Sequence, residues 1–175
     1  MRIIDLSLPL ETGMPVYPGD PEARIELIQT VAANGWNMRR IEINSHDGTH
    51  VNVPYHSLDA GKKLDDYALS DFCGPAVIYD AAQGIPSGRG VIFRDKNIDS
   101  ALAEEIKKAK PKFIGLSARF EFDTEVEKNL LAAGIVSFER LANCELLPPE
   151  FDFYGMPLAI RGGDGSPVRA FAIVP

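Results

Sequence analysis

The chain has 175 residues, of which 45% are hydrophobic and 25% are charged, a composition typical of a folded globular protein rather than a disordered one. Its formal net charge of −7 argues against nucleic acid or an anionic membrane surface as the main partner, because both require a basic face. The two distant cysteines argue against a disulfide framework, and the lack of a long apolar run argues against a membrane span. We therefore expect a soluble, cytoplasmic protein.

The first half of the chain is expected to form mostly strands. Residues 11–21 contain three prolines and two glycines, and this pattern predicts an irregular loop. Two of the predicted strands are expected to pair around a turn at Asn34 and Gly35. The predicted strands are residues 3–8, 23–31, 38–44, 76–79 and 91–93.

The second half introduces helices. Ser100 is expected to cap a helix over residues 100–110, and Gly134 is expected to end a second helix over residues 124–133. The predicted strands of this half are residues 113–116, 135–138, 157–161 and 168–174. The mixture predicts an α/β fold, with the direction of strand pairing left open. No linker or composition shift divides the chain, so residues 1–175 are expected to form a single domain.

The three histidines of the sequence all lie within eleven residues, at His46, His50 and His56. Histidine is the most common metal ligand and the usual acid or base near neutral pH, so this clustering indicates one shared site. Gly48 and Pro54 interrupt the segment and favour a strand that runs into a loop rather than a helix. The alternative is that all three side chains lie on a surface loop with no common role.

Residues 46–56, which follow the pattern His-x-Gly-Thr-His-x-Asn-x-Pro-x-His, resemble the motif of the cyclase family of metal-dependent hydrolases. That family includes bacterial kynurenine formamidase (arylformamidase) and isatin hydrolase. Further similarity lies at both ends and in the second half of the chain, in residues 5–7, 14–21, 134–139, 157–158 and 163–170.

The resemblance implies a swivelling β/β/α fold and hydrolysis of a small amide, formamide or lactam. It implies a divalent metal, zinc in the first place and manganese as an alternative, because mixed nitrogen and oxygen ligands suit both. His46 and His50 match metal ligands of the family, His56 matches its catalytic proton carrier, and Glu139 matches a carboxylate at its metal centre. The family also implies a homodimer or a higher homo-oligomer.

The chain departs from the family pattern at two candidate metal ligands. Asn52 stands where the family has Asp, and Glu127, twelve residues before Glu139, stands where it has His. Asn52 is either a ligand or a residue that holds the loop by hydrogen bonds to backbone. Glu127 is either a ligand or part of a capping box with Thr124, and Glu139 has the alternative of an ordinary surface carboxylate.

These departures affect the expected activity. An amide bridges two cations poorly, so we expect at most one tightly bound metal per chain, weak or narrow hydrolysis, and a gain of metal affinity in Asn52→Asp. An alternative function is a catalytically degraded family member that acts as a ligand-binding or regulatory module. Another is hydrolysis of an ester by the same chemistry.

Three further features have weaker support. Tyr17 and Trp36 are candidates for an aromatic substrate pocket, with core or loop packing as the alternative. Residues 162–165 predict a turn rather than a phosphate-binding loop, because they precede a strand and lack the Lys-Ser/Thr ending. The loop of residues 11–21, with apolar Met14 and Val16, is the segment expected to contact another copy of the chain.

Overall fold

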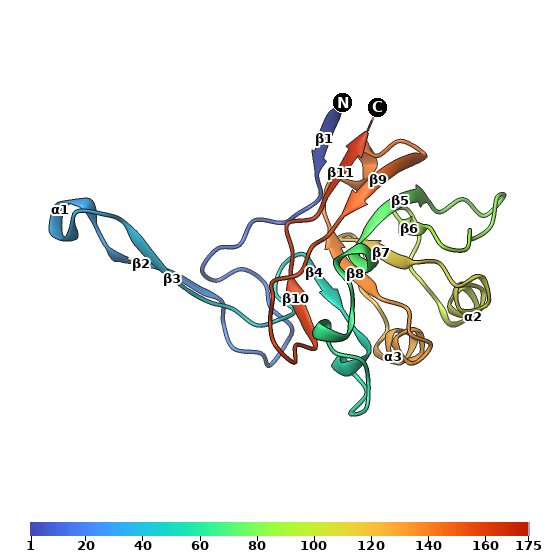
Figure 1. Ribbon diagram of the computed structural model, residues 1–175, viewed down its shortest axis with the longest axis horizontal. Coiled ribbons are helices and arrows are strands. Elements are labelled where there is room, and N and C mark those ends of the chain that lie inside the picture. The colour runs from blue at the N-terminus through green and yellow to red at the C-terminus, as the bar shows by residue number, and fades with distance from the viewer. Residues whose placement is uncertain (175) are drawn as a thin grey trace.

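Residues 1–174, the part of the chain that the computed structural model describes, form one nine-stranded curled sheet and a separate two-stranded hairpin (Figure 1). The central strands run parallel: β5 (Cys73–Ile78), β6 (Gly90–Phe93), β7 (Phe113–Ser117) and β8 (Ser137–Leu141). Antiparallel strands extend the sheet beyond β5: β9 (Glu150–Tyr154), β11 (Phe171–Val174) and β1 (Arg2–Asp5). Antiparallel strands also extend it beyond β8: β4 (His50–Asn52) and β10 (Gly165–Pro167). The expected α/β fold is confirmed, with a mixed sheet.

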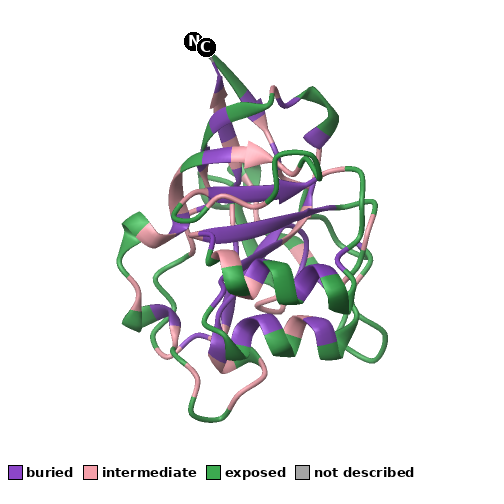
Figure 2. Cartoon of the chain, turned by 90° about the vertical axis from the view of Figure 1, so that its right-hand side faces the viewer, coloured by how far each residue is buried: buried purple, intermediate pink, exposed green. Residues whose placement is uncertain are grey.

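Two helices cover one face of the parallel strands. The helix α2 (Ser100–Ala109) connects β6 to β7, and α3 (Thr124–Ala132) connects β7 to β8. Figure 2 shows the two helices side by side over the buried strands, with exposed residues on their outer surface. Their apolar residues, including Ile106 and Leu130, pack against Phe93 and Leu116 of the sheet. The alternation along each strand places the next residue on the opposite face.

The opposite face of the sheet forms a second core around three mutually packed phenylalanines. The rings of Phe113, Phe138 and Phe153 have centroids 4.8 to 5.4 Å apart. All three side chains are fully buried, and burial of aromatic rings contributes strongly to folding. This core supports β8 and, through Val51, also β4.

The hairpin consists of β2 (Arg24–Gln29), the single helical turn α1 (Val31–Asn34) and β3 (Met38–Glu42), and extends away from the sheet (Figure 1). The predicted turn at Asn34 and Gly35 is confirmed, and Gly35 has the left-handed φ of 85° that favours glycine there. Within residues 1–174, no helix is long and apolar enough to cross a membrane.

Both helices begin at the predicted residue, Ser100 or Thr124, but the predicted N-caps are wrong by one position. Asp99, not Ser100, is the N-cap of α2, and its carboxylate accepts a hydrogen bond from the backbone N–H of Leu102. Asp123 caps α3 in the same way, so Thr124 and Glu127 do not form the capping box considered above. Aspartate is as good an N-cap as serine, and here it lies one position earlier. The side chain of Glu127 therefore takes no part in capping α3.

The predicted strands of the last third also need correction. Residues 157–161 do not form a strand, because only Pro157 makes an isolated bridge, to Val168, and the chain then turns. The predicted strand over residues 168–174 is confined to β11, and β10 precedes it. The sequence patterns do not predict β9, and β8 begins at Ser137 rather than at residue 135.

Candidate metal centre

The segment that carries the histidines lies between two antiparallel neighbours. In β4, His50 is directly opposite Glu139 of β8, and Asn52 is opposite Ser137. Val51, between them, points into the phenylalanine core, so His50 and Asn52 share the other face of the strand. His56 follows in a short 3-10 turn (Pro54–His56). The strand register thus brings the motif next to Glu139, which is 87 residues from Asn52 in the chain.

A β-bulge in β8 lies at Glu139 and Arg140. Gly115 of β7 is opposite Phe138, but Ser117 is opposite Leu141, so one extra residue stands on the β8 side. Arg140 takes the extra space with a left-handed φ of 54°. Because of the bulge, Phe138 and Leu141 both face the same core although they are three positions apart.

Thr49 connects this bulge to the histidine motif. Its hydroxyl donates a 2.7 Å hydrogen bond to the carbonyl of Arg140 and accepts one from the backbone N–H of Leu8. Thr49 is 2% exposed and directly precedes His50. The contacts therefore fix the position of β4 relative to Glu139.

Two carboxylates from different elements meet at Asn52. Its Nδ2 donates 2.5 Å hydrogen bonds to Oε1 of Glu127, from α3, and to Oε1 of Glu139. Ser137 Oγ donates to the same Glu127 oxygen at 3.3 Å, and His50 Nε2 lies 3.5 Å from Glu139 Oε1. The side-chain contacts of Asn52 show that it does not hold the loop by bonds to backbone, one of the alternatives above.

The pKa values of the two carboxyl groups are shifted in opposite directions by burial and by neighbouring groups. Burial, and then the charge of Glu139, raise the pKa of Glu127 to about 8. Burial also acts to raise the pKa of Glu139, but the hydrogen bond and charge of His50 outweigh it and lower that pKa below its ordinary value. The Glu139 side chain is only 15% exposed, so the alternative of an ordinary surface carboxylate is wrong.

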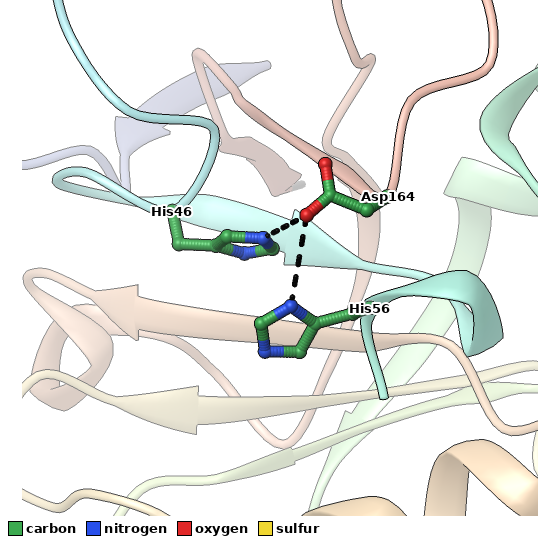
Figure 3. A group of neighbouring side chains, drawn as sticks. All are labelled: His46, His56 and Asp164. Atoms are coloured by element: carbon green, nitrogen blue, oxygen red, sulfur yellow. Dashed lines mark hydrogen bonds and ion pairs between the residues drawn. The ribbon is translucent and has the colours of Figure 1, made fainter. Parts of the chain in front are cut away.

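A second group of side chains lies on the other side of His46 (Figure 3). His46 Nε2 is 2.8 Å from Oδ2 of Asp164, and His56 Nδ1 is 3.8 Å from the same oxygen. The rings of His46 and His56 have centroids 3.9 Å apart. Burial and the charge of His46 lower the pKa of His56, while Asp164 acts in the opposite direction.

The donors present fit a divalent cation. His46, His56 and Asp164 each offer one ligand atom, all within 4.8 Å of one another. Across the described part of the chain, no lysine or arginine forms an ion pair with Glu127 or Glu139, although both are largely buried. Buried carboxylates are normally paired or bound to a metal, and imidazole with carboxylate is a common ligand set for zinc.

The structure thus brings together all six residues predicted for the metal and proton-transfer roles: His46, His50, Asn52, His56, Glu127 and Glu139. Asp164 is not among the predicted site residues, because the sequence predicts a turn over residues 162–165. A turn is present at residues 161–162, but Asp164 directly precedes β10, the partner of β4. The signal in the sequence that could have identified Asp164 as a site residue is its acidic side chain within a segment, residues 163–170, that resembles the family.

Both predicted substrate-binding aromatics are exposed in the single chain. Trp36 is 59% exposed and its indole N–H donates to Gln29 Oε1. It belongs to the β2–β3 hairpin, which extends away from the sheet (Figure 1). Tyr17 is 66% exposed in the loop of residues 11–21. Met14 of that loop, expected to be exposed, is buried beside Gly48, because the loop folds against the histidine motif.

Comparison with known proteins agrees with this geometry. The Cyclase family model matches residues 4–125, which include the whole histidine motif. The chain belongs to the cyclase family. This confirms the resemblance stated above for residues 46–56.

Relatives match this chain over nearly their full length. Kynurenine formamidase of Salinibacter ruber is 27% identical, over 97% of this chain and 96% of that protein. Kynurenine formamidase of Geobacillus thermodenitrificans is 28% identical, over 95% of each. Among solved structures, isatin hydrolase A from Ralstonia solanacearum superposes with a TM-score of 0.80, at 22% identity over 99% of this chain and 92% of that one. A structure named "predicted metal-dependent hydrolase from Bacillus stearothermophilus" gives 0.76, at 21% identity over 98% and 97%. The structural matches confirm the expected cyclase fold.

Proposed function

We propose that this protein is a metal-dependent hydrolase that cleaves the C–N bond of a small amide, formamide or lactam. The observation that carries the proposal is the convergence of three histidines with two buried carboxylates that have no lysine or arginine partner among the described residues. Full-length similarity to proteins named kynurenine formamidase supports an amide or formamide as the substrate class. The proximity of His56 to His46 and His50 favours an enzyme over the non-catalytic alternative.

The proposed metal ligands are His46, His50 and Glu139, with Glu127 as an additional carboxylate. A zinc ion, or a manganese ion, bound there would polarise the scissile carbonyl and lower the pKa of water toward neutrality. Glu139, whose pKa is lowered, supplies negative charge that favours a divalent cation, and its burial strengthens the attraction. A bound cation would also favour the ionised form of Glu127, whose pKa is raised in the metal-free chain. This ligand set uses side chains from β4, β8, α3 and the loop before β4.

His56 is the proposed proton carrier. Its pKa is lowered by burial and by the charge of His46, so the neutral imidazole is available to accept a proton at neutral pH. Asp164 faces Nδ1 of His56, which leaves Nε2 for the reaction. In this role His56 accepts a proton from the attacking water and then donates it to the nitrogen of the leaving amine, so the proton balance closes within one turnover.

We also propose that the protein forms a homo-oligomer, at least a dimer. The β2–β3 hairpin extends from the sheet and exposes apolar side chains, including Leu27, Trp36 and Ile41. A two-stranded hairpin is marginally stable alone in water, so a second copy that covers these side chains would stabilise it.

The function is tested with untagged protein, metal analysis and a panel of amides, formamides, lactams and lactones. We expect turnover of a C–N substrate that depends on the added metal. His56→Ala should keep its metal content and lose about 10²- to 10⁴-fold in kcat. Ser57→Ala is the matched control, since Ser57 is adjacent in the chain and its hydroxyl has no hydrogen-bond partner among the described residues.

Two results would contradict the proposal. One is full turnover by His56→Ala on the substrate of the wild type, which would remove the role of the histidine. The other is a metal-loaded protein that hydrolyses no member of the panel. Preference for lactones over amides would instead indicate the ester alternative.

A further inference from the structure

Asn52 has each polar atom of its side chain in contact with a residue of the candidate centre. It is fully buried, its Oδ1 lies 2.7 Å from His46 Nδ1, and its Nδ2 lies 2.5 Å from both carboxylates. The reverse orientation of the amide would place an oxygen against two carboxylate oxygens, which are acceptors themselves. The contacts therefore define which end of the amide faces which partner.

We propose that Asn52 is a positioning residue that holds Glu127 beside Glu139 and sets the orientation of His46, and that it is not itself a metal ligand. The proposal rests on the metal site given under the proposed function. It differs from the ligand role considered from the sequence. An amide binds metal through its oxygen, and here that oxygen accepts a hydrogen bond from His46.

The chemistry of an amide suits this position. The NH₂ group has two hydrogens, one for each carboxyl group, and it adds no charge beside Glu139. An aspartate at position 52 would remove both donors and place a further buried negative charge beside Glu139. We therefore expect Asn52→Asp to destabilise the metal-free protein, rather than simply to improve the site.

Hydrogen bonding by Asn52 also determines how His46 can act. Because Asn52 Oδ1 is an acceptor, His46 must carry hydrogen on Nδ1 to make that contact. Its Nε2 faces the Asp164 carboxylate at 2.8 Å, a contact that needs a second ring hydrogen in the metal-free chain, and a cation bound at Nε2 would take the place of that hydrogen. This is a common arrangement of metal-binding histidines, in which an oxygen accepts from the ring nitrogen that does not bind the metal.

The first test exchanges the two ends of one hydrogen bond. Urea unfolding of the metal-free protein is measured for the wild type, Asn52→Asp, Glu127→Gln and the double variant. We expect a lower urea midpoint in Asn52→Asp and recovery of at least half of the loss in the double variant, because a glutamine at position 127 can donate to an aspartate at position 52. Asn129→Asp, an exposed amide that also contacts a carboxylate, is the control and should change the midpoint little.

Recovery in the double variant supports the positioning role even if Asn52→Asp alone does not fold. An unchanged midpoint in Asn52→Asp, or a double variant no more stable than Asn52→Asp, would overturn it. Neither readout depends on catalysis, so a protein that hydrolyses nothing in the panel would contradict the proposed function and leave this test intact.

A spectroscopic measurement tests the second half of the proposal. In the zinc-loaded wild type, nitrogen-15 NMR of the His46 ring should show hydrogen on Nδ1 and zinc on Nε2. The Asn52→Ala variant should bind zinc about 10- to 100-fold more weakly, the usual cost of losing a partner of a metal ligand. Zinc bound to Nδ1 of His46, or unchanged zinc affinity in Asn52→Ala, would overturn the role.

Discussion

Replacing Glu127 by glutamine should remove a pH-dependent loss of stability from the metal-free protein. The carboxyl group has a pKa of about 8 in the fold, against 4.5 ordinarily, because it is buried and lies beside Glu139. Between these two pH values the folded chain holds a proton that the unfolded chain releases. The free energy of unfolding therefore falls as pH rises through this range. The contribution of Glu127 to that free energy is largest below pH 4.5.

The size of the effect follows from the two pKa values. Where the folded chain keeps the proton and the unfolded chain does not, each pH unit lowers the unfolding free energy by about 1.4 kcal/mol. Glutamine has nearly the same shape as glutamate but does not ionise. Glu127→Gln should therefore match or fall below the wild type at pH 5 and exceed it by several kcal/mol at pH 9.

The assay is urea unfolding in a chelating buffer at several pH values from 5 to 9. The quantity of interest is the difference between the two proteins at each pH, because groups that do not contact Glu127, such as His56, contribute nearly equally to both; the difference reports Glu127 together with Glu139, which titrates with it. Glu125→Gln, an exposed carboxylate on the same helix, is the control and should run parallel to the wild type. Parallel curves for Glu127→Gln and the wild type would refute the reasoning, because they would mean that Glu127 ionises freely in the fold.

The remaining predictions concern metal content, the bulge and the assembly. His46→Ala and His50→Ala should each lose most of the bound metal without unfolding, because these side chains contribute little to the core; unchanged metal per chain in both would contradict the ligand assignment. Arg140→Gly should keep the bulge, whereas Arg140→Val should lower the unfolding free energy by about 1–3 kcal/mol, since a β-branched residue tolerates the left-handed backbone poorly; equal stability of the two variants would exclude backbone strain as the reason. Light scattering at micromolar concentration should show at least a dimer, and deletion of residues 24–42 should lower the measured molar mass toward that of the monomer. A monomeric wild type would argue against the oligomer.

Much of the candidate centre could be predicted from the sequence alone, because several of its side chains come from one short segment of the chain. Residues 46–56 place three histidines on one short stretch of chain, and strand alternation puts His50 and Asn52 on the same face whatever the partner strands are. The helices were predictable for a similar reason, since α2 has a strong apolar stripe and Gly134 follows α3. These features depend on neighbours within a few positions, which the sequence displays directly.

Tertiary structure alone decided what surrounds that segment. Asp164 lies 118 residues from His46, and only the pairing of β10 with β4 brings its carboxylate to the imidazole. Glu127 fits a local capping pattern in the sequence, but Asp123 occupies the cap and leaves Glu127 to meet Asn52. Local patterns specify which hydrogen bonds a residue is able to make. The packing of α3 against the sheet, and the register of the strands, determine which of those bonds form, because a buried carboxylate takes the partners that the distant segments bring to it.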